Sequence, residues 1–218
     1  MDADGFALVA RAAARDAIAS VLTELADDAG RTRAGARGVL ARPSVRALAD
    51  ALAELVGSVL DGPAFPYRAT LFDKSARANW LVAWHQDTAL PVLARVDAPG
   101  WGPWTTKAGV LHAIAPAEAL GRVIALRIHL DDSTADNGPL RVIPRSHLDG
   151  VLPDAEIERR VASGTVVTCL AERGDVLLMR PLLLHASSKA ATGAPRRVLH
   201  VEYATDRALP GGIRLADG

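Results

Sequence analysis

The strongest constraint on the fold is a series of short runs of β-branched and other apolar residues, which begins near Pro66 and continues to about Ala204. Turn sequences rich in glycine, proline, aspartate and asparagine separate these runs. No helical pattern alternates with them regularly, so a parallel βαβ sheet is disfavoured and an antiparallel sandwich or jelly roll is favoured. The predicted strands are residues 67–72, 79–86, 123–130, 140–143, 165–170, 176–179, 182–185 and 198–204.

Two helices are predicted before the first strand. Apolar residues recur every three or four positions between residues 11 and 26, and again from Val45 onward, behind a helix-starting Pro43. Half of the 218 residues are apolar, which is enough for one domain with a substantial core. We therefore expect a single domain, in which residues 1–64 form a mainly helical part packed on one side of a jelly-roll core at 65–205.

The segment 88–122 differs from the strands around it, because several prolines and glycines interrupt any regular pattern. It is predicted to be one long loop, and a loop of this length inside a compact domain is usually functional. Folded over the mouth of the barrel, it would exclude water and select the substrate through Trp104 and Lys107. Arg127, on the strand that follows, is a further candidate for a substrate or co-substrate contact, with a structural ion pair as the alternative.

Charge and composition narrow the possible partners and compartment. The 25 Lys and Arg residues balance the 25 Asp and Glu residues, so we expect neither nucleic acid nor an anionic membrane surface as a partner. No run approaches the roughly 20 apolar residues of a membrane span. A single cysteine, Cys169, suits a reducing compartment, so a cytoplasmic protein with a small-molecule substrate is predicted. The sequence leaves the oligomeric state open.

Two histidines and one aspartate form the main candidate site. His85 and Asp87 lie two residues apart at the end of a predicted strand, so their side chains point to the same face. His185 follows another apolar strand almost one hundred residues later. Two imidazoles and one carboxylate cover one face of an octahedral metal and leave three adjacent positions open, as in non-haem Fe(II) oxygenases. The same three ligands also suit the Zn²⁺ of a hydrolase.

An arginine just before the last predicted strand gives this site a second component. Arg196 follows the distal histidine by eleven residues. A planar guanidinium can hold a carboxylate through two parallel hydrogen bonds, which suits the distal carboxylate of the co-substrate 2-oxoglutarate. A metal-binding jelly roll that uses oxygen without 2-oxoglutarate would have no need of this arginine.

Several short motifs accompany these residues in a particular order and spacing. They are residues 71–74, 79–87, 130–132, 137–147, 174–179 and 185–188. This pattern, which spans about residues 65–203, resembles the phytanoyl-CoA dioxygenase-like family of Fe(II)- and 2-oxoglutarate-dependent oxygenases. The sequence departs from the family pattern at Arg145, where the family usually has a glycine in a turn.

The resemblance implies a mainly β fold, a double-stranded β-helix (jelly roll, cupin-like), with the N-terminal helices packed on one side. It implies that His85, Asp87 and His185 bind Fe(II) and are the catalytic residues. It also implies that Arg196 binds the distal carboxylate of 2-oxoglutarate, assisted by the hydroxyl of Ser187.

Two further residues are connected with the co-substrate. Lys74 is similar in position to a lysine that contacts 2-oxoglutarate in some members of the family. Arg197 competes with Arg196, because alternation along the strand places Arg197 on the more apolar face, together with Leu199 and Val201. The spacing found in the family selects Arg196.

These observations predict an Fe(II)- and 2-oxoglutarate-dependent dioxygenase that consumes O₂ and releases succinate and CO₂. The expected reaction is hydroxylation of an unactivated C–H bond in a small acyl thioester, acid or natural-product intermediate. Asp87 favours hydroxylation over halogenation, because related halogenases replace this carboxylate by a small residue. The alternatives are a non-catalytic or 2-oxoglutarate-independent metal-binding jelly-roll protein, and a zinc hydrolase.

Overall fold

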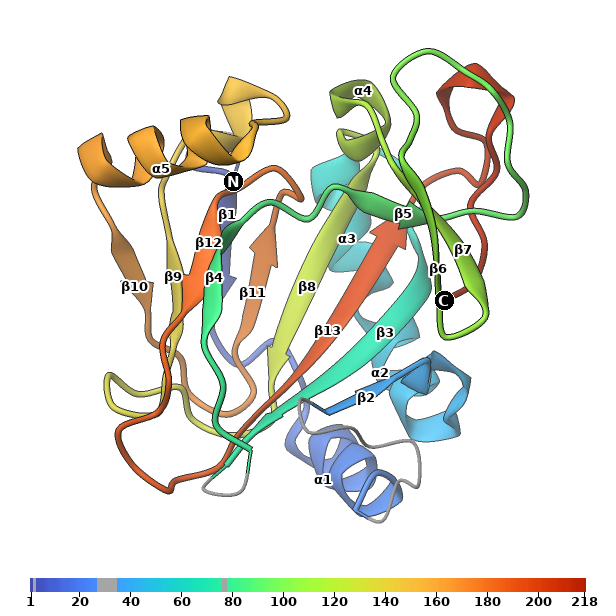
Figure 1. Ribbon diagram of the computed structural model, residues 1–218. Helices are drawn as coiled ribbons and strands as arrows, with labels where there is room; N and C mark the ends of the chain where they lie inside the picture. Colours follow the sequence, from blue (N-terminus) through green and yellow to red (C-terminus); the bar gives the residue numbers. More distant parts are fainter. Residues whose placement is uncertain (2, 27–34, 76–77) are drawn as a thin grey trace.

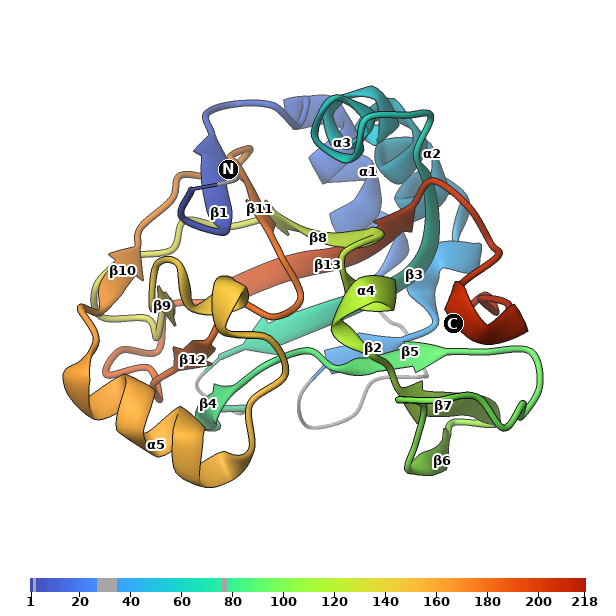
Figure 2. The ribbon, with the colours of Figure 1, turned by 90° about the horizontal axis from the view of Figure 1, so that it is seen from above.

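Two antiparallel sheets face each other in the computed structural model, which describes residues 1, 3–26, 35–75 and 78–218 (Figures 1 and 2). The larger sheet consists, in spatial order, of β1 (Phe6–Val9), β11 (Val176–Met179), β8 (Val123–His129), β13 (Arg196–Ala204), β3 (Phe65–Lys74) and β2 (Gly35–Arg37). The smaller sheet consists of β10 (Val167–Cys169), β9 (Leu140–Val142), β12 (His185–Ser187) and β4 (Val82–His85). The predicted jelly-roll fold is thereby confirmed.

Three helices cover the outer face of the larger sheet (Figure 2). They are α1 (Arg15–Glu24), α2 (Pro43–Ala51) and α3 (Ala53–Leu60). Their apolar sides share one buried cluster with the outward side chains of the sheet, including Ile18, Leu48 and Leu199. The hydroxyl of Tyr203 donates a hydrogen bond of 2.8 Å to the carbonyl of Ala49 and ties β13 to α2. The predicted helical layer on one side is therefore present, with the second helix broken into two.

Alternation along β13 separates this apolar layer from the interior between the sheets. Leu199 and Val201 are fully buried under the helices. Arg196 and His200, on the other face, line a cavity between the two sheets. Because successive side chains of a strand point to opposite faces, one strand supplies both the core and the cavity.

The segment 88–122, predicted to be a loop, contains regular structure. It forms a third antiparallel sheet of β5 (Ala89–Pro91), β7 (Val110–Ile114) and β6 (Trp104–Lys107), followed by α4 (Ala117–Leu120). The residues that suggested a loop mark the ends of these short strands: Pro91 ends β5, and Gly109, with φ +81°, lies in the turn from β6 to β7. This sheet stands beside one end of the two main sheets (Figure 1).

The remaining elements were not predicted. Helix α5 (Asp154–Ser163) has no fully buried residue and lies outside the smaller sheet (Figure 2). Three short 3-10 helices are η1 (Val39–Ala41), η2 (Ser146–Asp149) and η3 (Pro210–Gly212). Gly30, expected to end the first helix, lies outside the described residues. Within the part of the chain that the structure describes, no helix has the length and apolar character needed to cross a bilayer.

Candidate active site

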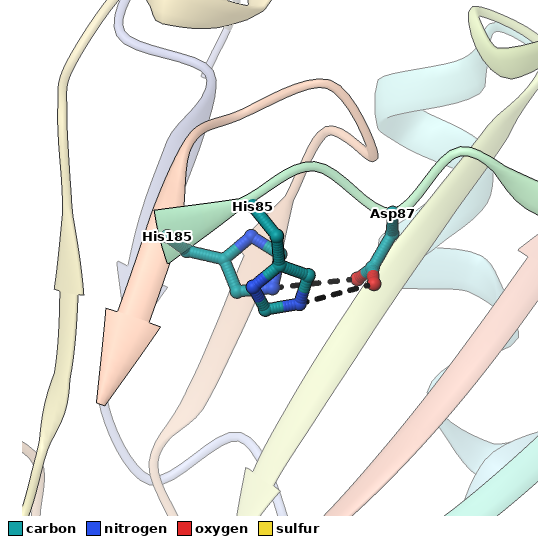
Figure 3. A group of neighbouring side chains, drawn as sticks. All are labelled: His85, Asp87 and His185. Carbon is teal, nitrogen blue, oxygen red and sulfur yellow. Dashed lines mark ion pairs between the residues drawn. The ribbon is translucent and has the colours of Figure 1, made fainter. Parts of the chain in front are cut away.

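The two histidines and the aspartate come together at neighbouring strands of the smaller sheet (Figure 3). His85 on β4 lies directly opposite His185 on β12, and the centroids of their rings are 4.2 Å apart. Asp87 follows β4, where its backbone N–H donates to the carbonyl of Pro181 at 2.9 Å. The three candidate ligand atoms lie within 4.8 Å of one another. His185 begins β12, whereas the sequence pattern predicted that it would end a strand.

Backbone carbonyls orient both imidazole rings. Nδ1 of His85 lies 2.8 Å from the carbonyl oxygen of Ala83, and Nδ1 of His185 lies 2.9 Å from that of Leu183. A carbonyl oxygen only accepts hydrogen bonds, so each Nδ1 carries the proton and each Nε2 presents a lone pair. These Nε2 atoms lie 3.7 Å and 3.5 Å from the carboxylate oxygens of Asp87. Two lone pairs and a carboxylate that converge in this way fit a divalent metal ion.

The protonation states agree with this donor set. Burial lowers the pKa of His185 to about 4, although the negative charge of Asp87 acts in the opposite direction. Burial by itself would raise the pKa of Asp87, but the charges of the surrounding histidines and of Arg68 lower it to about 2. At neutral pH the site therefore offers a neutral imidazole and an ionised carboxylate, which are the forms that bind metal ions.

The three residues line a cavity of about 440 Å³ between the main sheets. Four further candidates from the sequence line the same cavity: Ser187, Arg196, Lys107 and Arg127. Trp104 is not among the lining residues; it packs against an apolar cluster, with the guanidinium carbon of Arg95 5.8 Å from its ring centroid. The structure thus brings together the metal-ligand and co-substrate candidates, but not Trp104.

Arg196 has an unusual environment for a buried cation. Its side chain is 2% exposed, and its Nε and Nη1 atoms have no hydrogen-bond partner among the described residues. Burial, together with the charge of Arg127, lowers its pKa to about 9. An unpaired buried guanidinium is costly, so this arrangement fits an anionic ligand such as the carboxylate of 2-oxoglutarate.

Arg197 points the other way. Its Nε and Nη2 atoms donate to the carboxylate of Asp131, each at 2.7 Å, and it does not line the cavity. Alternation along the strand offers Arg197 as the alternative to Arg196, if the more apolar face of the strand faces the site. In the structure the apolar face lies under the helices, and the more polar face lines the cavity.

Lys74 lies in a buried position beside Ser187. It is 0% exposed, and its ammonium group donates to the hydroxyl of Ser187 at 2.5 Å and to the carbonyl of Ser188. Burial is the main cause that lowers the pKa of Lys74 to about 7, and Arg196 contributes to the same shift. Since Ser187 accepts from Lys74, its own hydroxyl proton is available to a ligand in the cavity.

Sequence reasoning missed a polar group at the other end of the cavity. Arg68 on β3 makes two contacts with the carboxylate of Glu202 on β13, and its Nη1 donates to Nε2 of His112 at 3.0 Å. Part of the signal was available, because Arg68 lies in the predicted strand 67–72. Strand β3 continues to Lys74, an even number of residues away, so the two side chains share a face.

Comparison with known proteins places these features in context. The sequence is 26% identical over 179 residues to an L-proline trans-4-hydroxylase from Streptomyces griseoviridis, a match that covers 70% of this chain and 59% of that protein. The crystal structure of AviO1 from Streptomyces viridochromogenes Tue57 matches with a TM-score of 0.66 and 28% identity, over 95% of this chain and 92% of that one. The epimerase SnoN, solved with Fe³⁺, alpha ketoglutarate and nogalamycin RO, matches with a TM-score of 0.73 and 19% identity, over 97% and 84%.

A family model extends this similarity over most of the sequence. The model of phytanoyl-CoA dioxygenase matches residues 1–198, which include His85, Asp87, His185 and Arg196. The resemblance noted from the motifs is thereby confirmed. The chain belongs to the phytanoyl-CoA dioxygenase family.

Proposed function

We propose that this protein is an Fe(II)- and 2-oxoglutarate-dependent dioxygenase that hydroxylates a C–H bond of a small molecule and releases succinate and CO₂. The observation that carries this proposal is the pairing, in one cavity, of an open metal-ligand set with a buried guanidinium that lacks a partner. The family and the L-proline hydroxylase relative support the same reaction class. The chain spans 59% of the length of that relative.

The proposed ligands of the iron are His85, Asp87 and His185. Bound iron would supply the activation of O₂, with electrons from the oxidative decarboxylation of the keto acid. The protein residues hold the two imidazoles by their Nδ1 protons and keep Asp87 ionised, so the three ligands need little rearrangement when the metal enters.

The proposed site of the distal carboxylate of 2-oxoglutarate is formed by Arg196, Ser187 and Lys74. The guanidinium of Arg196 lines the cavity and would supply two parallel charge-assisted donors, and the hydroxyl of Ser187 would supply a third. Lys74 acts from behind Ser187: by donating to its oxygen, the ammonium group turns the hydroxyl proton toward the cavity. This set lies on β13, β12 and β3, so rigid strands position the co-substrate.

The size of the cavity limits the substrate. A volume of about 440 Å³ lies at the lower end of the range of small-molecule sites, and 2-oxoglutarate must share it. We therefore propose a compact, non-polymeric substrate, with Lys107 and Arg127 as candidate contacts. Residues 1–218 are proposed to form one oxygenase domain. The buried free thiol of Cys169 supports a cytoplasmic location as a further proposal.

The test is anaerobic addition of 2-oxoglutarate to the protein reconstituted with Fe(II). The expected result is the weak visible charge-transfer band that this chelate gives in related enzymes. The band should be lost in His185→Ala and Arg196→Met and kept in Arg197→Met, which removes an arginine outside the cavity. Iron binding without a band would support an oxygenase independent of 2-oxoglutarate. Failure to bind iron would overturn the proposed metal site.

A further inference from the structure

The cavity contains more buried positive charge than its proposed ligands neutralise. Two buried arginines, Arg196 and Arg127, line it, whereas Asp87 is the one side-chain carboxylate among its described lining residues. The two carboxylates of 2-oxoglutarate would balance the two charges of Fe(II). Asp87 would balance one guanidinium and leave the other without a counter-charge. A buried cation without a counter-charge is unfavourable, so a further anion is expected in the loaded site.

Arg127 is the buried arginine that lacks a counter-charge in this charge balance. Its side chain is 6% exposed, its Nε has no hydrogen-bond partner among the described residues, and no ion pair to a described carboxylate is found. Its Nη1 lies 3.5 Å from Nδ1 of His200, and its guanidinium carbon lies 5.6 Å from the centroid of the Phe72 ring. His200 is not a counter-ion, because an imidazole is either neutral or positive, and burial and the charge of Arg127 keep it neutral by lowering its pKa to about 3. The structural ion pair considered from the sequence is therefore not formed within the described residues.

The entrance to the cavity has the same sign of charge. Arg37 and Lys107 are exposed lining residues that flank His112, and neither forms an ion pair with a described residue. Arg68, behind them, is neutralised by Glu202. Charges of one sign at the mouth of a low-dielectric cavity attract ligands of the opposite sign.

We propose that the substrate is a small organic anion and that Arg127 binds its carboxylate or phosphate group. This inference rests on the proposed function. A guanidinium holds either group through paired hydrogen bonds, so Arg127 would fix one end of the substrate within the cavity that holds the metal ligands. Arg37 and Lys107 would raise the local concentration of the anion at the entrance.

The test measures ligand binding in the protein loaded with Zn(II) in place of Fe(II) and with 2-oxoglutarate, where no turnover occurs. Small carboxylic acids, including L-proline, are titrated calorimetrically beside their primary amides, and phosphate monoesters beside the parent alcohols. The variants are Arg127→Met, which removes the charge, and Arg127→Lys, which keeps it. Arg197→Met is the matched control, because it removes an arginine outside the cavity.

We expect at least one anion to bind the wild type, and its neutral partner to bind about tenfold more weakly or worse, as for the loss of a charge-assisted hydrogen bond. Arg127→Met should weaken the anion by a similar factor and weaken 2-oxoglutarate much less than Arg196→Met does. Arg127→Lys should restore part of the affinity, and Arg197→Met should change neither ligand. The arm that binds, acid or phosphate ester, identifies the anionic group.

Other outcomes would overturn the inference. If acids and amides bind equally well, the substrate is not recognised as an anion. The same follows if the wild type binds 2-oxoglutarate but none of the anions. In both cases the proposed function stands. Loss of 2-oxoglutarate binding in Arg127→Met as large as in Arg196→Met would assign Arg127 to the co-substrate. A wild type that fails to bind 2-oxoglutarate would overturn the proposed function and this inference with it. A lower melting temperature of Arg127→Met with unchanged anion binding would show a purely structural role, through the contacts with Phe72 and His200.

Discussion

Replacing Arg196 by methionine should separate ligand binding from folding stability. Its guanidinium lines the cavity and has no carboxylate partner in the described protein, and a planar guanidinium can hold a carboxylate through two parallel hydrogen bonds. Each hydrogen bond to a charged group contributes about 1.5–3 kcal/mol. Two bonds at the lower limit give about 3 kcal/mol, so we expect the dissociation constant of 2-oxoglutarate to rise about 100-fold.

The same substitution should leave the free energy of unfolding unchanged or raise it. In the ligand-free protein the charge of Arg196 is buried without a partner, as its lowered pKa of about 9 reflects. A flexible apolar side chain removes that unfavourable burial. Arg197→Met should show the reverse behaviour: it breaks the half-buried pair with Asp131, at a cost of about 1 kcal/mol in stability, and leaves 2-oxoglutarate binding intact.

Isothermal titration of the Zn(II)-loaded proteins and chemical denaturation of the metal-free proteins measure the two quantities. The reasoning is refuted if Arg196→Met binds 2-oxoglutarate within threefold of wild type, or if Arg197→Met is the variant that loses binding. A large loss of stability in Arg196→Met would show that this arginine has a structural partner after all.

Three other substitutions test separate parts of the site and fold. Burial and the charges of Arg196 and Arg127 lower the pKa of Lys74 to about 7, and bound 2-oxoglutarate, a dianion, should raise this pKa. The affinity for 2-oxoglutarate should therefore be constant below about pH 7 and fall as the pH rises above 7. Titration at several pH values checks this, and Lys74→Met should abolish the dependence; a flat wild-type profile would contradict it. Asp87→Ala should lower Fe(II) affinity by about tenfold or more, measured by metal competition, whereas an unchanged affinity would remove Asp87 from the ligand set. Tyr203→Phe should cost about 1 kcal/mol of unfolding free energy in denaturant titration, through loss of the hydrogen bond to Ala49, with 2-oxoglutarate affinity unchanged.

The central strands and the metal-ligand set could be predicted because the information is local. His85 and Asp87 share a face through the period of one strand, and β4 and β12 then place His185 directly opposite His85. The spacing typical of the family identified Arg196, and the structure brings it into the same cavity.

Alternation alone suggested Arg197, because it shows which residues share a face but not which face lies against the helices. The answer depends on α1–α3, which bury Leu199 and Val201.

Other features depend on contacts that a single segment does not encode. Strand β1 has four residues, and it is a strand because it pairs with β11, which is far away in the sequence. In the segment 88–122, prolines and glycines mark the ends of three short strands. These strands are stabilised because they pair with one another. Trp104 was expected at the substrate, but its ring packs against an apolar cluster instead.

The most direct test of the proposed function follows the oxygen atoms. The reconstituted protein is incubated with Fe(II), 2-oxoglutarate and isotopically labelled O₂, and the succinate is examined by mass spectrometry, with His185→Ala and Arg197→Met beside the wild type. The proposed function predicts succinate with one labelled oxygen from wild type and Arg197→Met, and none above background from His185→Ala. Wild type that binds iron yet forms no labelled succinate, or His185→Ala that forms as much as wild type, would contradict it.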